Sequence, residues 1–217
     1  MITKFPSEIG WTENQKYTLL YKWGIRYRLK RIGYHSRGKV LDIGWYQSPN
    51  PFLKNVVGLD AVATENLPYN YRSSLKIDLN NPYPYPFIDD CFDTVTAGEI
   101  IEHVTNLDSF LKEISRVLKP GGKLIISTPN PASPVATQVH FFKWFFKRVD
   151  FNYILNGGHV QSFLFTEMIN LLNLYHFKPI KMEGTYIQIP FTNIQIPLNI
   201  QPITYCTIYV AVNQKKV

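Results

Sequence analysis

Cysteine is scarce in this sequence of 217 residues, and no long uncharged apolar run occurs in it. The two cysteines, Cys91 and Cys206, are far apart, and neither has a second cysteine at the spacing of a metal or redox site. They indicate reduced thiols, and we expect a cytoplasmic location. The start of the chain has no apolar stretch behind a basic end, so we expect no secretory signal. No apolar run approaches the length that spans a membrane.

Acidic residues are also few, with 16 Asp and Glu against 23 Lys and Arg and a net charge of +7. The excess is concentrated in residues 16–39, which carry eight cations and no carboxylate. The first interpretation of such a run is a solvated face of a terminal helix. An anionic substrate or a lipid headgroup comes second. Nucleic acid is disfavoured, because no RNA- or DNA-binding motif accompanies the charge.

Apolar residues make up 45% of the chain, which excludes a disordered protein and suits one compact domain over residues 1–217. Residues 1–37 form a leading helical segment, with an amphipathic helix at 12–33, and residues 38–217 form an α/β core. Short β-branched runs predict strands at 39–44, 55–60, 74–79, 92–97, 123–128, 180–189 and 205–212. Helical spacing predicts helices at 107–118 and 165–175. This alternation favours a mainly parallel sheet covered on both faces, with ligands bound at the carboxyl ends of its strands.

Four blocks of this sequence are similar to a known family. They are V-L-D-I-G at 40–44, V-V-G-L-D at 56–60, F-D-T-V-T-A-G-E-I-I-E-H-V at 92–104, and L-K-E-I-S-R-V-L-K-P-G-G-K-L-I-I-S-T-P-N at 111–130. A weaker fifth block is G-H-V-Q-S-F at 158–163. They resemble the class I S-adenosylmethionine-dependent methyltransferases, in particular the group (type 11) acting on small molecules, lipids and sugars. The resemblance implies a Rossmann-like, seven-stranded, mostly parallel sheet with helices on both faces and an antiparallel last strand.

The resemblance also implies a set of cofactor-binding residues. Asp60 matches the acidic residue that accepts both ribose hydroxyls, a task that needs two acceptor oxygens at one point. Asp78, followed by Leu79, matches the position that contacts adenine. Gly44 allows a close approach of the backbone, and Asp42 orders that loop. The expected set for S-adenosyl-L-methionine is Asp42, Gly44, Trp45, Tyr46, Asp60, Ala61, Asp78, Leu79 and Gly98.

The loop after the first strand departs from the family pattern D-x-G-x-G-x-G. Tyr46 and Ser48 stand at the second and third glycine positions, where tyrosine does not easily take a positive φ. Pro49 and Pro51 follow and exclude a long helix here. We expect that the prolines have rebuilt the loop so that Tyr46 lines the pocket. The alternative is a decayed site.

Candidate catalytic residues follow the fourth strand and lie in the fifth block. Glu99, Glu102 and His103 fall at i, i+3 and i+4, which predicts one helical face beside the reacting methyl group. His159 is a further candidate base, with His140 after it. In some quinone-precursor methyltransferases a stretch similar to E-x-x-E-H is associated with a divalent metal, but for this chain we expect no metal.

Residues 139–155 are unusual in carrying a broad aromatic face and a narrow cationic one. They fall within a lid-like insertion expected around residues 133–156. Three interpretations stay open, which are a helix packed on the core, a lid over an apolar acceptor, and peripheral membrane contact.

The leading functional hypothesis is methyl transfer to a small acceptor that is hydrophobic or linked to a lipid or sugar, with an anionic group as an option. The alternative is a catalytically silent protein of this fold that acts as a binding or partner subunit. A nicotinamide dehydrogenase is disfavoured, because G-x-G-x-x-G is missing after the first strand.

Overall fold

The computed structural model of the protein describes residues 19–62, 66–80, 84–134, 136–137, 159–189, 194–200 and 203–215. Seven strands form the main sheet, namely β1 (Val40–Ile43), β2 (Val56–Asp60), β3 (Tyr71–Lys76), β4 (Phe92–Gly98), β5 (Leu118–Pro129), β6 (Phe177–Gly184) and β9 (Cys206–Asn213). The longer helices are α1 (Leu19–His35), α2 (Leu107–Val117) and α5 (Phe165–Leu174), and a single 3-10 turn, η2, covers Ile101–His103. A separate ribbon pairs β7 (Tyr186–Gln188) with β8 (Gln195–Pro197).

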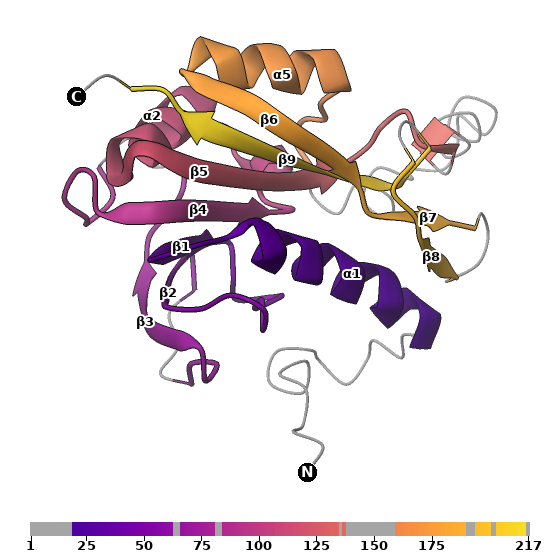
Figure 1. The fold of residues 1–217 in the computed structure, drawn as a ribbon, viewed down its shortest axis with the longest axis horizontal. Helices are drawn as coiled ribbons and strands as arrows, with labels where there is room; N and C mark the ends of the chain where they lie inside the picture. The colour runs from indigo at the N-terminus through magenta and orange to yellow at the C-terminus, as the bar shows by residue number, and fades with distance from the viewer. Residues whose placement is uncertain are drawn as a thin grey trace.

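The main sheet has the order β3-β2-β1-β4-β5-β9-β6. The first five of these strands are parallel to one another, whereas β9 is antiparallel to both β5 and β6. This arrangement confirms the predicted seven-stranded, mostly parallel sheet with an antiparallel last strand (Figure 1). The parallel strands therefore end at one edge, where such sheets bind their ligands.

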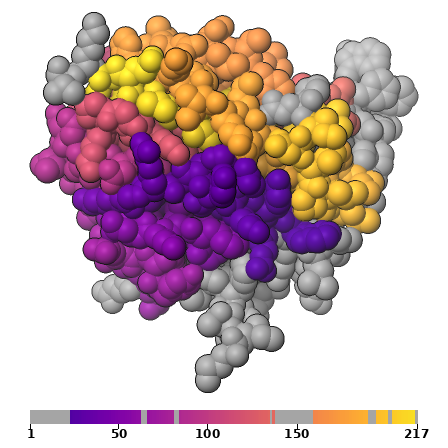
Figure 2. All heavy atoms as spheres, in the orientation of Figure 1, coloured from indigo at the N-terminus to yellow at the C-terminus, as the bar shows by residue number. Residues whose placement is uncertain are grey.

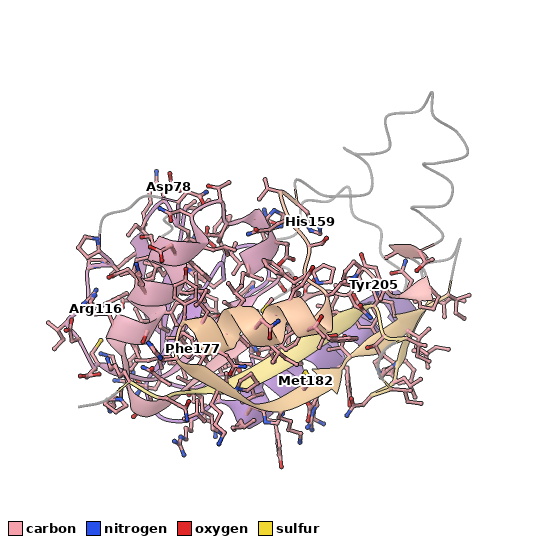
Figure 3. The ribbon with its side chains drawn as sticks, turned by 90° about the horizontal axis from the view of Figure 1, so that it is seen from above. Asp78, Arg116, His159, Phe177, Met182 and Tyr205 are labelled. Atoms are coloured by element: carbon pink, nitrogen blue, oxygen red, sulfur yellow. The ribbon has the colours of Figure 1, made fainter. Side chains whose placement is uncertain are left out.

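The two faces of the sheet carry separate apolar cores. Residues of α2 and α5 pack on one face with the large cluster that includes Phe92, Phe110 and Leu172. Ile32 of α1 packs on the other face with Trp45 and Ile125. Figures 1 and 3 show α1 on one side of the sheet and α2 and α5 on the opposite side. Helices on both faces are thus confirmed.

Several predicted boundaries shift. The third strand is at Tyr71–Lys76 and not at 74–79, because Tyr71 is buried against Trp45 and pairs with the start of β2. The strand predicted at 180–189 is two strands, since the chain leaves the main sheet after Gly184 and continues as β7. The partner of β7, β8, carries no clear signal in the sequence.

The leading helix starts at Leu19 in the described part of the chain, and the earlier residues of the predicted helix lie outside the described residues. The solvated-face interpretation expects every cation of this helix to face water, and that expectation is wrong for Arg28. Arg28 is buried and donates to Ser127 Oγ at 2.9 Å. No helix among the described residues is long and apolar enough to cross a membrane.

Arg31 fastens α1 to β6 through two hydrogen bonds to the buried carboxylate of Glu183, at 2.8 and 2.6 Å. Lys181 Nζ lies 2.8 Å from the same carboxylate, and His35 Nε2 lies 3.1 Å from it. Burial would raise the pKa of Glu183, but the hydrogen bonds from Arg31, Lys181 and His35 outweigh it and lower the pKa to about 2. The ionised carboxylate therefore stabilises the fold fully at a pH above 4.5, the ordinary pKa of a glutamate. This stabilisation is lost as the pH falls towards 2.

We predict that Glu183→Gln lowers the free energy of unfolding by about 2–4 kcal/mol at pH 7, because Arg31 loses its buried partner. Urea unfolding measures it. The difference from wild type should shrink between pH 4.5 and pH 2, where Glu183 takes up a proton. Asp108→Asn, which breaks an exposed pair with Lys112, should leave the unfolding midpoint unchanged. A Glu183→Gln variant as stable as wild type at pH 7 would contradict this role.

Candidate functional site

The candidate site lies at the carboxyl ends of β1, β2 and β4, with the inner side of α1 facing them. Its centre is Asp42, a buried carboxylate in β1. Thr96 Oγ1 donates to Asp42 Oδ1 at 2.6 Å, and the Tyr71 hydroxyl donates to Asp42 Oδ2. Burial raises the pKa of Asp42 to about 6, although both hydrogen bonds oppose the rise. Asp42 is thus mostly ionised at neutral pH and holds the hydroxyls of Thr96 and Tyr71 in place.

The loop after β1 contains no long helix, as the two prolines predict, and it is anchored by Asn50 between them. The buried side chain of Asn50 donates to the carbonyl of Leu29 in α1 at 3.1 Å and accepts from Phe52 N at 3.0 Å. Its backbone N–H donates to the Tyr71 hydroxyl at 3.1 Å. The loop after β1 is therefore tied to both α1 and β3.

Trp45 was expected to contact the cofactor, but its side chain is 3% exposed and lies in the core. The indole packs over Gly58, where a Cβ atom would collide with it, and its ring centre lies 4.8 Å from that of Tyr71. This packing corrects the expectation for Trp45. Its side chain supports the loop from below.

Asp60 at the end of β2 binds the loop after β1 directly. Its Oδ2 accepts from Tyr46 N at 2.9 Å, and its Oδ1 accepts from Val62 N at 3.1 Å. A carboxylate offers about four lone-pair sites, so about two remain for hydroxyl donors. Tyr46 itself is 36% exposed at this rim, and Ala61 is exposed beside it.

Arg28, Gly44 and Gly98 surround a small cavity at the middle of the site, together with Asp42, Ser48 and Asn50. Gly44 has φ +74°, and a Cβ atom there would lie 2.9 Å from Ile100 Cδ1, so no side chain fits. The cavity measures about 20 Å³, room for roughly one water molecule. A larger ligand can enter only if the loop after β1 or a neighbouring side chain shifts. Arg28 was not predicted as a site residue.

Asp78 and Leu79 follow β3, and Asp78 accepts from Asn80 N at 2.9 Å. The backbone N–H of Ile77 donates to the carbonyl of Asp60 at 2.8 Å, which brings Asp78 near the end of β2. Leu79 is buried in the core cluster under this loop. Figure 3 shows Asp78 at the outer side of the fold.

Glu99 corrects a second expectation, because Glu99, Glu102 and His103 do not share a helical face. Glu99 has φ +55°, a strained left-handed conformation for a residue with a side chain, and helical structure begins only with the 3-10 turn η2. Glu99 Oε1 accepts from the thiol of Cys206 at 3.0 Å and lies 3.9 Å from Arg28 Nη1. Glu99 therefore faces α1 and β9.

Glu102 points inward and meets His159 from the fifth block. Thr128 Oγ1 donates to Glu102 Oε2 at 3.1 Å, and His159 Nε2 lies 3.9 Å from Glu102 Oε1. Burial, then the charge of Glu99, raises the pKa of Glu102 to about 8, whereas burial and His103 lower the pKa of His159. His159 is thus neutral at pH 7 and can accept a proton. It lies on the side of the sheet that carries α2 and α5 (Figure 3).

The ring centre of His103 lies 4.7 Å from that of His159, and ligand atoms of Glu102, His103 and His159 lie within 4.8 Å of one another. These three residue types can bind a divalent cation. However, the raised pKa of Glu102 means that a proton competes with a cation at neutral pH. We therefore keep the expectation of proton transfer without a metal.

Gln161 positions His159 and was missed as a site residue, although it stands two residues after His159 in the fifth block. Its Nε2 donates to the carbonyls of Ile101 and Val104 at 3.1 and 2.6 Å. The backbone N–H groups of Val160 and Gln161 both donate to the carbonyl of Glu102. Gln161 thus ties the segment that carries His159 to η2.

His140, residues 139–155 and most of the insertion around 133–156 lie outside the described residues. The three interpretations of that segment stay open.

We predict that Tyr46→Gly weakens binding of S-adenosylhomocysteine about two- to fivefold, because glycine keeps the N–H bonded to Asp60 but loosens the loop. Tyr46→Phe, which keeps the ring, should bind as wild type does. Calorimetry measures both. Tighter binding by Tyr46→Gly would indicate that the tyrosine obstructs a decayed site.

We predict that Gln161→Met raises the pKa of His159 towards the ordinary imidazole value, because the segment loses its attachment and water reaches the ring. Gln161→Lys, which keeps an N–H donor for the two carbonyls, should hold the pKa low. NMR titration measures it, with His159→Gln for assignment. His35, whose pKa is also lowered by burial, should not change. An unchanged His159 in Gln161→Met would remove Gln161 from this role.

Comparison with known proteins gives relatives for part of the chain. Residues 43–126 match the family model described as "Methyltransferase domain". A demethylmenaquinone methyltransferase of Shouchella clausii is 35% identical over 44% of this chain and 43% of its own length. The mitochondrial ubiquinone biosynthesis O-methyltransferase of Rattus norvegicus is 36% identical over 35% of this chain and 25% of its own length. The aligned region thus spans less than half the length of these curated relatives.

Solved structures share the whole fold at low identity. A methyltransferase of Thermotoga maritima that depends on S-adenosylmethionine superposes with a TM-score of 0.68 at 18% identity, covering 91% of this chain and 92% of its own. The sheet order, the strand-end site and the matched segment agree with one another. Residues 43–126 thus match a methyltransferase domain, and the chain has the fold of a solved S-adenosylmethionine-dependent methyltransferase.

Proposed function

We propose that this protein transfers a methyl group from S-adenosylmethionine to a small hydrophobic acceptor of the quinone-precursor or lipid-linked class. The observation that carries the proposal is the buried guanidinium of Arg28, which faces a cavity beside Gly44 while Asp60 stands at the neighbouring strand end. This set can bind both ends of one cofactor.

The residues fit the cofactor by their chemistry. Arg28 has five N–H donors and donates one of them to Ser127, so the others can pair with the carboxylate of the cofactor's amino-acid end. Asp60 is oriented by two backbone N–H groups and keeps acceptor capacity for the ribose hydroxyls. Asp78, which follows β3, would contact the adenine. Gly44 leaves the backbone accessible between these points.

S-adenosylmethionine supplies an electrophilic methyl group when it is bound. Holding an acceptor in line with this group accounts for much of the rate, since orientation alone can be worth about 7–11 kcal/mol. His159 is neutral at pH 7 and can take the proton that a hydroxyl acceptor loses, an effect of roughly 10²–10⁴ in rate. Glu102 is oriented by Thr128 and lies 3.9 Å from His159 Nε2, and its raised pKa keeps its own proton in place at pH 7.

The acceptor class rests on the relatives and on the site. The two curated relatives described above are named for demethylmenaquinone and for ubiquinone biosynthesis. A catalytically silent binding subunit is the second candidate, because the cavity that the described residues form beside Arg28 and Gly44 measures only about 20 Å³. Binding of cofactor decides between them.

We predict that wild-type protein binds S-adenosylhomocysteine and that a concentration of about 100 times Kd adds roughly 2.7 kcal/mol of stability. Asp60→Ala and Arg28→Lys should each weaken binding at least tenfold, because each removes charge-assisted hydrogen bonds. Calorimetry and thermal unfolding measure these effects. Asp89→Ala, an exposed carboxylate paired with Arg116 outside the site, is the matched control and should bind as wild type does.

Absence of binding by wild type would overturn the proposal and favour the silent subunit. Binding that survives in Asp60→Ala would remove Asp60 from the ribose site. Methyl transfer itself is measured with a labelled methyl donor against a panel of dihydroxyaromatic acceptors that carry or lack an isoprenoid tail.

A further inference from the structure

The outer face of α1 carries an aromatic and cationic stripe, made of Trp23, Arg26, Tyr27, Lys30 and Tyr34. Their spacing of 3, 4, 7 and 11 residues from Trp23 places them within about 100° on an α-helix. Trp23 is 57% and Tyr34 is 71% exposed, and Arg26 and Lys30 are exposed between them. In Figure 2, α1 crosses the middle of the visible surface.

The helix itself supplies no carboxylate to this stripe. Residues 19–37 contain no Asp or Glu. Two other cations of the helix are committed elsewhere, since Arg28 is buried and Arg31 is paired with Glu183. The Arg31 guanidinium also lies 4.6 Å from the ring centre of Tyr34 and so supports the ring at the surface. The charged side chains that α1 itself contributes to this face are therefore all cationic.

The composition of the stripe favours an anionic lipid surface over the alternatives. A solvated helix face ordinarily mixes charges of both signs and exposes no tryptophan. Nucleic acid binding depends on many phosphate contacts, typically 6–10, and this stripe offers two cations. Tyrosine and tryptophan, in contrast, place an apolar ring and a polar edge at a membrane interface, where lysine and arginine meet lipid phosphates.

The surface beside α1 extends the apolar contact. The helix packs against β8, and Ile196 of that strand is 47% exposed. Figure 2 shows the gold surface of the β7 and β8 region next to the indigo helix. The stripe therefore continues, through β8, towards the edge of the sheet where the parallel strands have their carboxyl ends.

We propose that the outer face of α1 docks the protein on a membrane that contains anionic phospholipid. This docking deepens the proposed function, on which it rests, because it places the strand-end site beside the bilayer, from which a hydrophobic acceptor can enter. Rings at both ends of the stripe and cations between them would hold the helix flat on the interface. The site would then open along the membrane plane.

Sedimentation with vesicles tests the proposal. Wild type should bind vesicles of phosphatidylcholine with 30% phosphatidylserine at least tenfold more tightly than phosphatidylcholine alone, and less tightly in high salt. Lys30→Glu should weaken this binding at least tenfold, and so should Trp23→Ser with Tyr34→Ser. Lys112→Glu makes the same charge change on the opposite face, and Leu174→Ser removes an exposed apolar side chain there. Both controls should bind as wild type does.

A second measurement does not depend on the folding of these variants. Brominated lipids should quench wild-type tryptophan fluorescence, and Trp23→Phe should remove a clear part of that quenching. S-adenosylhomocysteine affinity, measured on each variant, should not change, so vesicle binding and cofactor binding can fail independently. The proposal is overturned if wild type ignores anionic vesicles, if vesicle binding survives both stripe variants, or if a tRNA probe binds the stripe in preference to vesicles.

Discussion

The buried carboxylate of Asp42 is the constraint on which the site depends. It accepts hydrogen bonds from the hydroxyl of Thr96 in β4 and from the hydroxyl of Tyr71 at the start of β3. The same Tyr71 hydroxyl accepts the backbone N–H of Asn50, and Asn50 in turn reaches the carbonyl of Leu29 in α1. One charge thus aligns two strands on either side of β1, the loop and the helix, and a buried charge is tolerated only when its partners are in place.

Most of the fold could be predicted because its signals are local. Alternating β-branched runs and helical spacing locate the strands and α2, and the Pro120-Gly121-Gly122 stop after Val117 is visible in the sequence. The errors have long-range causes. The third strand starts earlier because Tyr71 packs on Trp45, and β8 exists because it pairs with β7 and packs on α1. Neither contact leaves a periodic pattern in its own segment.

The site was predictable only where topology decides it. Asp42, Asp60 and Gly98 stand at strand ends, and parallel strands bring those ends together. Arg28 reaches Ser127 across 99 residues, and a charge run gives no indication of which cation turns inward, except that Leu29 and Ile32 mark the apolar side. The direction of the Glu99 side chain was mispredicted because its left-handed backbone ends the strand without starting a helix. Helical spacing therefore misplaced its side chain.

Arg28 and the surface stripe share one helix, and this has a consequence for how the chain can change. Each added residue turns the following part of an α-helix by about 100°. A one-residue insertion between Trp23 and Arg28 would move the tryptophan away from the outer face while the guanidinium kept its place. Substitutions within α1 can therefore change one face without affecting the other. The number of residues between Trp23 and Arg28, in contrast, must stay the same, so homologues should vary here in residue type and not in spacing.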